Sequence, residues 1–252
     1  MPPQPPPTRT GLARAMSKLG FCSRSRATEL IRMGKVKVNL VVRKNPEFPV
    51  ILKKDVIIMD DVSINQAPRL YVMLNKPRGL VTSASDELGR ETVFSCFENS
   101  KLPHLAPVGR LDKASEGMLL FTNDNVWADT ITNPDTHLDK TYHVQISGTL
   151  DEKRLALIRQ GVVDEEHGDH LSAKVIKILR SGEKNIWLEV VLDEGRNRHI
   201  RRLLEAFNIE VLRLVRVKIG MLVLGNLQKG QWRELTKYEV LKSREPQELR
   251  PD

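Results

Sequence analysis

The sequence has 252 residues, of which 40% are hydrophobic and 29% charged, enough for the core of one medium domain and one small domain. Its 40 Lys and Arg outnumber its 32 Asp and Glu, which favours a polyanionic partner such as nucleic acid and argues against an acidic tail. Cys22 and Cys96 are its only cysteines. A disulfide framework and a zinc-binding cysteine cluster are therefore excluded, and a reduced, cytoplasmic protein is expected.

Both ends of the chain are expected to lie outside the folded domains. Residues 1–9 form a proline-rich leader of polyproline-like, disordered character, without the basic-then-apolar order of a signal peptide. Residues 244–252 are expected to form a flexible tail. No apolar run approaches the roughly 18–20 residues of a membrane span, so no membrane partner is expected.

Positive charge is concentrated in the first fifth of the sequence. Residues 10–60 hold eleven Lys and Arg against four Asp and Glu. Apolar spacing predicts a helix that stops at Gly20 and a second helix that Ser23 caps and that ends at Gly34. Residues 35–38 and 55–59 predict two strands. Residues 10–61 are therefore predicted to form a small αα-β module with a basic face, for which an ordinary solvated face is the alternative.

A polar segment, residues 62–69, is predicted to link this module to a second domain at residues 70–243. Strands are predicted at 70–74, 117–121, 142–146, 186–192 and 211–215. Helices are predicted at 125–132, at 151–160 with Asp151 as N-cap and Gly161 as C-cap, and at 197–207. Strands outnumber helices and do not alternate with them strictly. The second domain is therefore predicted to be α+β, with a mixed, mainly antiparallel sheet and packed helices.

One loop and one arginine-rich segment could carry chemistry. Asp112 lies in a charged loop that leads through Gly117 into a buried strand, so we expect its carboxylate near the domain interior, where it needs a partner to stay ionised. Residues 194–204 supply several arginines at the start of a predicted helix, and an arginine fork can hold a carboxylate and still reach a phosphate. Taken alone, such an Arg-Leu-Asp turn is more often a structural ion pair than an active site.

Five ordered motifs resemble those of the pseudouridine synthases that modify ribosomal RNA. They are an opening strand and turn at 74–80, a catalytic loop at 109–124, a tyrosine-bearing strand at 140–144, an arginine motif at 194–202, and closing strands at 213–220 and 230–235. The resemblance covers roughly residues 70–241. Residues 12–60 resemble the RNA-binding domain named after ribosomal protein S4. Several motifs in the same order are far more specific than any one of them.

The resemblance implies that Asp112 is the catalytic aspartate, Tyr142 the aromatic residue against the target base, and Arg201 the basic partner of Asp112. Pseudouridine formation breaks the bond from ribose to a base nitrogen, turns the uracil, and rejoins ribose to a base carbon. An ionised carboxylate can attack, or remove a sugar proton, without any cofactor. Tyr142 shares a strand face with Val144 and Ile146, which suits stacking on a flipped base, and plain core packing is the alternative.

Cations in both domains are expected to contact RNA. Lys76 and Arg78, in a turn broken by proline and glycine, are expected to contact backbone phosphates or line the rim of the pocket. The complete set consists of Arg14, Lys18, Arg24, Arg26, Arg32, Lys35, Lys37, Lys76, Arg78, Arg110, Arg196, Arg198 and Arg202.

Two residues depart from the family pattern. Leu40 stands where the small module usually has a turn glycine, which puts the geometry of that turn in doubt. His199 replaces the usual glutamine of the arginine motif, so a contact near Arg201 is expected to differ.

Three other features are expected to be structural. Residues 164–170 contain His167, Asp169 and His170, but the segment is a polar, glycine-containing loop that predicts a solvated turn rather than a metal site. Glu116, beside Gly117, is expected to make a loop contact. Aromatic residues within strand and helix patterns predict packing rather than a stacking platform; these are Trp127, Trp187 and Trp232.

These patterns predict a monomeric isomerase that converts uridine to pseudouridine in ribosomal RNA or a pre-ribosomal particle. The arginine–asparagine–arginine form of the arginine motif slightly favours the large subunit. No metal, nucleotide or organic cofactor is implied. One alternative is a ribosome-associated RNA-binding protein that lacks catalysis. Another is a base-excising glycosylase, which ordinarily needs two cooperating carboxylates or an activated water.

Overall fold

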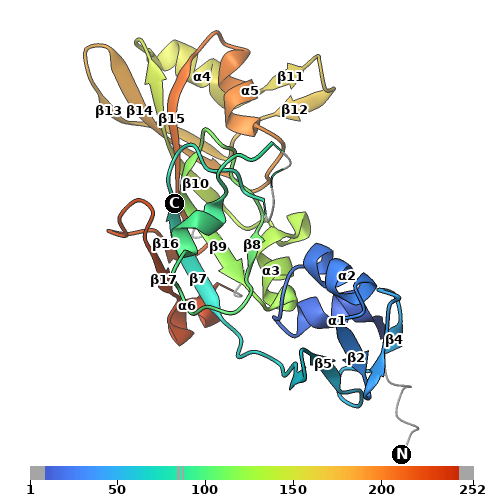
Figure 1. Cartoon of the computed structure of the whole chain (residues 1–252). Coiled ribbons are helices and arrows are strands. Elements are labelled where there is room, and N and C mark those ends of the chain that lie inside the picture. The colour runs from blue at the N-terminus through green and yellow to red at the C-terminus, as the bar shows by residue number, and fades with distance from the viewer. Residues whose placement is uncertain (1–8, 84–85, 87, 244–252) are drawn as a thin grey trace, which may run out of the picture. The chain divides into compact units, whose positions relative to one another are not determined.

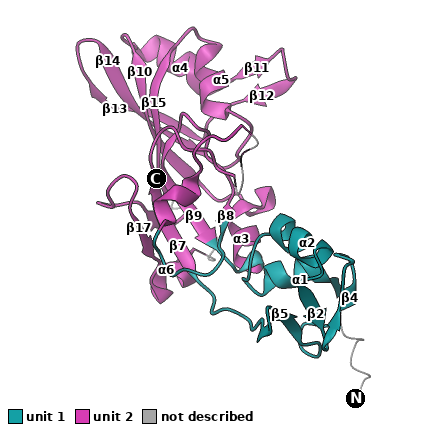
Figure 2. Cartoon of the chain, viewed as in Figure 1, with its two compact units in different colours: residues 1–70, 99–106, 122–125 teal, residues 71–98, 107–121, 126–252 magenta. Residues whose placement is uncertain are grey.

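The computed structural model describes residues 9–83, 86 and 88–243 (Figure 1). The predicted tail and nearly all of the predicted leader lie outside these residues. Two compact units divide the chain (Figure 2), and each is described by itself. The division falls after Leu70, and residues 99–106 and 122–125 group with the N-terminal unit. None of the described helices is long and apolar enough to cross a bilayer.

The N-terminal unit is a module of two helices and short antiparallel strands. Its core is buried between the helices and the short strands and includes Leu12, Met16 and Ile31, none of which is exposed. Ser23 caps the second helix, because its side chain accepts a hydrogen bond from the backbone N–H of Arg26. The elements are α1 (Leu12–Lys18), α2 (Arg24–Arg32), a sheet of β3 (Val41–Val42), β2 (Val36–Val38), β5 (Ile57–Met59) and β6 (Val62–Ser63), and a pair of β1 (Thr10–Gly11) and β4 (Pro49–Val50).

Two tight turns close the hairpins of this sheet. The turn at Asn39 and Leu40 has φ values of 51° and 69°, and the turn at Asp60 and Asp61 has 47° and 62°. Two successive left-handed residues are the geometry of the two-residue hairpin loop. Leu40 therefore keeps the turn geometry that its departure from the family pattern put in doubt. The second turn sends the chain back as β6, so the first two residues of the expected linker are a strand.

The C-terminal unit is built on a nine-stranded sheet, with antiparallel pairs on most of its length (Figure 1). β15 and β9 pair in parallel. This mixed sheet with packed helices is the α+β fold that the sequence predicts. Its main order is β13 (Val175–Ser181), β14 (Asn185–Leu192), β10 (Lys140–Ser147), β15 (Val211–Ile219), β9 (Glu116–Thr122), β7 (Tyr71–Lys76) and β17 (Trp232–Glu234), with β16 (Leu222–Val223) beside β15 and β8 (Ala106–Val108) beside β9.

Helices and one separate hairpin complete this unit. The sequence signals for α4 are confirmed, since Asp151 accepts a hydrogen bond from the Arg154 N–H and Gly161 follows the last turn. The helix predicted from residue 197 begins two residues later, because Arg198 takes a left-handed conformation with φ of 49°. The elements are α3 (Asn125–Thr132), α4 (Glu152–Gln160), α5 (His199–Glu205), α6 (Lys237–Lys242), the 3-10 turns η1 (Val93–Phe97) and η2 (Pro134–Thr136), and a hairpin of β11 (Val162–Asp164) and β12 (Asp169–Leu171).

The parallel contact between β9 and β15 requires a glycine. Gly117 has φ of 99°, and a Cβ atom placed on it would lie 2.3 Å from the carbonyl oxygen of Arg216. Trp127 packs in the core of this unit with no exposed surface, as predicted. Trp187 is half-buried, with the guanidinium of Arg180 5.0 Å from its ring centre. Strand β9, whose second residue is Gly117, is buried at every position and so anchors the end of the loop that precedes it.

Candidate active site

A cavity of about 360 Å³ opens in the C-terminal unit. Its walls come from the loop before β9, from β10 and β15 of the sheet, and from the loop that leads into α5. All three predicted catalytic residues, Asp112, Tyr142 and Arg201, line this cavity. Of the predicted RNA-contacting cations, Arg110, Arg196 and Arg198 also line it, whereas Lys76, Arg78 and Arg202 do not.

The loop that carries Asp112 is tied down through its backbone. Five successive carbonyl oxygens, from Leu111 to Ser115, all accept hydrogen bonds. The Thr82 hydroxyl donates to the Leu111 oxygen at 2.7 Å, and the Gly79 N–H donates to the Lys113 oxygen at 2.8 Å. A loop whose carbonyls are all bound has little freedom to move. The backbone of Asp112 is therefore held in place at the wall of the cavity.

Lys76 supplies two of these five contacts. Its ammonium donates to the carbonyl oxygens of Asp112 at 3.2 Å and Ser115 at 2.8 Å, and also to Pro77 at 3.1 Å. The side chain has no exposed surface. Burial lowers the pKa of Lys76 to about 8, and the charge of Asp112 opposes that shift. The expectation that Lys76 contacts phosphates or lines the rim is therefore wrong, because the strand β7 directs it into the protein.

The surroundings of Asp112 differ from those expected. Asp112 is exposed, and its carboxylate makes no hydrogen bond or ion pair with any residue that the structure describes. The sequence predicted a carboxylate held in the interior by Arg201. Gly109 and Arg110 are also exposed, so this end of the loop faces the cavity rather than the core. An unpaired carboxylate at the cavity wall is accessible to a substrate.

Arg201 approaches the same loop by another route. One guanidinium nitrogen, Nη2, donates to the Ala114 oxygen at 3.2 Å, and Nη1 donates to the Val211 oxygen at 3.3 Å. Burial lowers the pKa of Arg201; the charge of Arg198 acts in the same direction, and that of Asp112 opposes it. Arg201 therefore places positive charge beside Asp112 and ties α5 to the loop, but it does not form the expected ion pair.

Tyr142 lies on the floor of the cavity. It sits on β10 between Val190 of β14 and Arg216 of β15, and only 8% of it is exposed. Val144 and Ile146 follow it on the same buried side of the strand. The ring is therefore part of both the core and the cavity surface. Core packing and stacking on a base, the two alternatives for Tyr142, are compatible with this position.

Behind the loop, Glu116 is held more firmly than a loop contact would be. It is the first residue of β9 and 2% exposed, and Arg213 donates to its two oxygens at 2.9 and 3.0 Å. The Lys229 ammonium lies 2.5 Å from the same carboxylate. Burial opposes ionisation of Glu116, but these hydrogen bonds hold its pKa below the usual value. The loop contact expected from sequence is thus a buried ion pair, formed by partners about 100 residues away.

The basic residues predicted in the N-terminal unit are mostly exposed. Lys37 is the exception: it is half-buried and its ammonium lies 2.7 Å from Asp61. Arg26 pairs with Glu29 one helical turn along α2. In the C-terminal unit, Arg78 is exposed and donates to the Leu212 oxygen at 3.4 Å. The exposed set in the first unit is Arg14, Lys18, Arg24, Arg26, Arg32 and Lys35.

The predicted solvated turn is confirmed at residues 165–168, which form an exposed turn at the tip of the β11–β12 hairpin. Asp164 and Asp169, on either side of this turn, instead pair with arginines of the α5 segment. Among the described residues, no group of three or more His, Cys, Asp or Glu is arranged to hold a metal ion. His199 is buried, with Nδ1 3.6 Å from Glu194, and burial lowers its pKa.

Comparison with known proteins defines the class of this protein. Residues 70–206 match the model of the RNA pseudouridylate synthase family, and residues 10–57 match the model of the S4 domain. The chain therefore belongs to the RNA pseudouridine synthase family, whose members isomerise uridine in RNA.

Relatives and a solved structure extend the match over almost the whole chain. A ribosomal large subunit pseudouridine synthase B from Bacillus subtilis is 34% identical over 235 residues, which cover 92% of this chain and 95% of that protein. An uncharacterized RNA pseudouridine synthase of Rickettsia prowazekii is 36% identical, covering 89% and 94%. The crystal structure of a pseudouridylate synthase superposes with a TM-score of 0.63 and 30% identity, covering 93% of this chain and 99% of that one.

Proposed function

We propose that this enzyme converts a uridine of ribosomal RNA to pseudouridine, that large-subunit RNA is its substrate, and that Asp112 is the catalytic aspartate. The observation that carries the assignment of Asp112 is the set of five bound carbonyls, which present an unpaired carboxylate to a cavity shared with Tyr142 and Arg201. The large-subunit substrate is supported by the similarity to the Bacillus subtilis protein along nearly its full length.

The reaction needs few groups. The bond from ribose C1′ to N1 of uracil breaks, the base turns, and C1′ joins C5, while the C5 proton leaves to water and N1 gains a proton. A carboxylate can attack the nucleotide or remove a sugar proton. A ring at the cavity floor can stack on a base turned out of the RNA. Arg201 adds positive charge beside Asp112, at the wall of the same cavity.

RNA contacts follow from exposure. We propose that Arg78, Arg110 and Arg198 contact the RNA near the target nucleotide, and that the exposed cations of the S4 domain bind its phosphates. We further propose that the protein acts as a monomer in the cytoplasm, on free ribosomal RNA or on a pre-ribosomal particle. Sedimentation of the purified protein at micromolar concentration tests the monomer directly, since a dimer has twice the mass.

Asp112→Asn is the test of the catalytic assignment. The amide keeps the size of the side chain but can neither attack nor accept the sugar proton, and the other cavity carboxylates, Asp193 and Glu194, lie on a different loop. Because Asp112 is exposed and unpaired, we expect the free energies of unfolding and of RNA binding to stay within about 0.5 kcal/mol of the parent values. Turnover, measured as tritium release from ribosomal RNA labelled at C5 of uridine, should fall to the detection limit.

Asp129→Asn is the matched control, because Asp129 is an exposed carboxylate on α3 that does not line the cavity. Its turnover should equal that of the parent. Retention of a tenth of the parent turnover by Asp112→Asn would place the catalytic group elsewhere. Mapping pseudouridines across ribosomal RNA from cells with and without the gene identifies the substrate: loss of one large-subunit site supports the proposal, and loss of a small-subunit site refutes that part of it.

A further inference from the structure

The β11–β12 hairpin contains an unfavourable pair of charges. Asp164 and Asp169 lie directly opposite each other at the end of the hairpin next to its tip. Like charges at directly opposed positions of two strands repel and destabilise the pairing. A hairpin of two three-residue strands has little else to keep it closed. Within the tip, the Glu166 N–H donates to Asp164 at 3.1 Å and His167 lies 3.3 Å from it. A counter-charge that reaches both aspartates from another part of the chain would stabilise the closed hairpin further.

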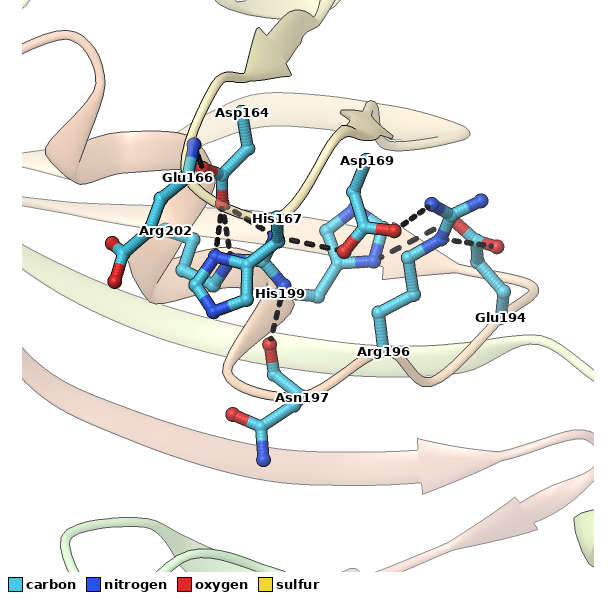
Figure 3. Close-up of polar contacts among 9 residues, drawn as sticks. All are labelled: Asp164, Glu166, His167, Asp169, Glu194, Arg196, Asn197, His199 and Arg202. Atoms are coloured by element: carbon cyan, nitrogen blue, oxygen red, sulfur yellow. Dashed lines mark hydrogen bonds and ion pairs between the residues drawn. The ribbon is translucent and has the colours of Figure 1, made fainter.

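Arg202 of α5 supplies that charge (Figure 3). Its guanidinium contacts the carboxylates of both aspartates, Asp164 in a very short hydrogen bond and Asp169 at 2.8 Å. The third nitrogen donates to the Asn197 carbonyl oxygen at 3.2 Å. Only 11% of the Arg202 side chain is exposed. Each nitrogen is thus bound within the protein, so a contact with an RNA phosphate would have to break this arrangement.

Arg196 extends the network to the wall of the cavity. Its Nη1 donates to Asp169 at 2.8 Å and its Nε donates to Glu194 at 3.0 Å (Figure 3). Glu194 in turn lies 3.6 Å from the buried His199 at the first position of α5. Residues 193–198 line the cavity, and the helix they lead into carries Arg201.

The start of α5 has no side-chain cap, although the His199 N–H donates to the Arg196 oxygen at 3.3 Å. Its N-cap residue, Arg198, has a left-handed backbone and makes no side-chain capping hydrogen bond. A helix normally begins with such a cap, which satisfies a free backbone N–H of its first turn. Arg196 joins the same segment to the hairpin through Asp169, and Arg202, which the hairpin holds, donates to the Asn197 oxygen within the segment. The hairpin therefore adds fixed contacts to a loop whose helix lacks a side-chain cap.

We infer that the β11–β12 hairpin is a positioning element of the active site, in which Asp164 and Asp169 hold Arg202 and Arg196 and thereby fix the 193–198 loop and Arg201. Arg202 is then a positioning residue rather than an RNA contact, which revises its assignment from the sequence. This inference deepens the proposed function and rests on it, because the loop matters only if the cavity is the site of reaction.

The two roles for the arginines predict opposite effects. If Arg196 and Arg202 bound RNA, replacing a carboxylate that competes for them, in Asp164→Asn or Asp169→Asn, would tighten RNA binding. Arg202→Gln would weaken it. In the positioning role, all three variants lower kcat by about tenfold to 100-fold, because small misplacements of catalytic groups cost that much. The Kd for ribosomal RNA stays within about twofold of the parent.

Glu152→Gln is the matched control, since it removes an exposed carboxylate of an ion pair on α4 that does not line the cavity. Its kcat should equal that of the parent. Hydrogen exchange of the amides at 196–202 should speed up in Asp164→Asn and not in Glu152→Gln. Tighter RNA binding with unchanged kcat in the two aspartate variants would overturn the inference.

Conservative variants keep the test decisive if an amide variant fails to fold. Arg202→Lys retains the charge but cannot contact both carboxylates and Asn197 together, so its kcat should lie between those of the parent and Arg202→Gln. Asp164→Glu should retain most of the turnover. Parent-like kcat in Arg202→Lys would refute the inference. If the parent itself released no tritium, the proposed function would fail, while exchange at 196–202 would still measure whether the hairpin fixes the loop.

Discussion

At the scale of single residues, the buried ammonium of Lys76 holds the loop that carries Asp112 from the interior of the protein. Its three acceptors are neutral carbonyl oxygens, and no carboxylate of the described residues lies within ion-pair distance of it. A charge buried without a counter-ion normally destabilises the fold. Here the same charge binds two carbonyls of the loop that carries Asp112. Its burial therefore lowers the stability of the fold, while its hydrogen bonds fix the loop.

The pH dependence of stability tests the burial of Lys76. The pKa of Lys76 is about 8 in the folded protein, against an ordinary value of 10.5. Between pH 8 and 10.5 the unfolded chain keeps a proton at Lys76 that the folded chain gives up, so the free energy of unfolding increases as the pH rises. Lys76→Met has no titrating group at this position and does not show this increase. The stability difference, parent minus Lys76→Met, should rise by on the order of 2 kcal/mol across this window in urea titrations. A flat difference would show that the ammonium is solvated.

At the scale of elements, two positions with a left-handed backbone test how much that backbone costs. They are Leu40 in a hairpin turn and Gly117 at the contact of β9 with β15. Leu40 has φ of 69° and is 79% exposed. A left-handed backbone costs a residue with a side chain about 1–2 kcal/mol, and glycine avoids that cost but loses more entropy on folding. Because Leu40 buries little, no packing offsets the strain.

Leu40→Gly should therefore stabilise the protein by about 0.5–1 kcal/mol, measured as a rise in the urea midpoint. Asp60→Gly, at the first position of the other tight turn, is the control. Aspartate tolerates the left-handed region, so its replacement should change little. Lower stability of Leu40→Gly would mean that the leucine side chain makes a contact that the structure does not contain.

Gly117 tests the parallel contact of β9 and β15. Gly117→Ala adds a methyl group 2.3 Å from the Arg216 oxygen, on a backbone with φ of 99°. Strain and overpacking together should cost about 3 kcal/mol or more, measured by thermal unfolding. Gly148→Ala has a similar φ, 82°, but nothing within 4 Å of the added atom, so it should show the strain alone. Equal losses in both variants would show that the strands separate readily.

At the scale of the whole molecule, the proposed catalytic residues lie in one unit, and most of the proposed phosphate-binding cations lie in the other. The cavity and its charged network lie entirely in the C-terminal unit. The S4 domain carries exposed cations in helices α1 and α2 and next to β2. Electrostatic binding to phosphates depends steeply on salt because each neutralised phosphate releases counter-ions. Charge changes in the S4 domain should therefore alter RNA affinity without altering the chemical step.

Replacing Arg14, Lys18, Arg24, Arg32 and Lys35 by Gln tests this division. The slope of log affinity against log salt for ribosomal RNA should decrease by about 0.7 for each phosphate that the variant no longer neutralises. The kcat at saturating RNA should stay that of the parent. A variant with Lys53→Gln and Lys54→Gln, exposed in the same unit but outside the predicted set, is the control. An unchanged slope in the fivefold variant would refute the binding role of these residues.

The sequence by itself determined much of the local structure and three residues of the cavity. Helix α4 with its caps and the strands β7, β9, β10, β14 and β15 follow from apolar spacing and capping residues, and the grouping of Asp112, Tyr142 and Arg201 follows from the resemblance of ordered motifs. These signals are short in range, or they are carried by motifs in a fixed order, so they can be recognised before the chain folds.

Only the tertiary structure decided which charged groups are partners. Lys76 contacts backbone carbonyls some 40 residues away, Glu116 pairs with Arg213, and Arg202 closes a hairpin that the sequence predicts as a solvated turn. Side-chain charges look alike in a sequence, whether they meet RNA, a carboxylate or a carbonyl oxygen. Their partners are set by the approach of distant strands and helices, because an ion pair depends on separation in space and leaves no periodic signal along the chain.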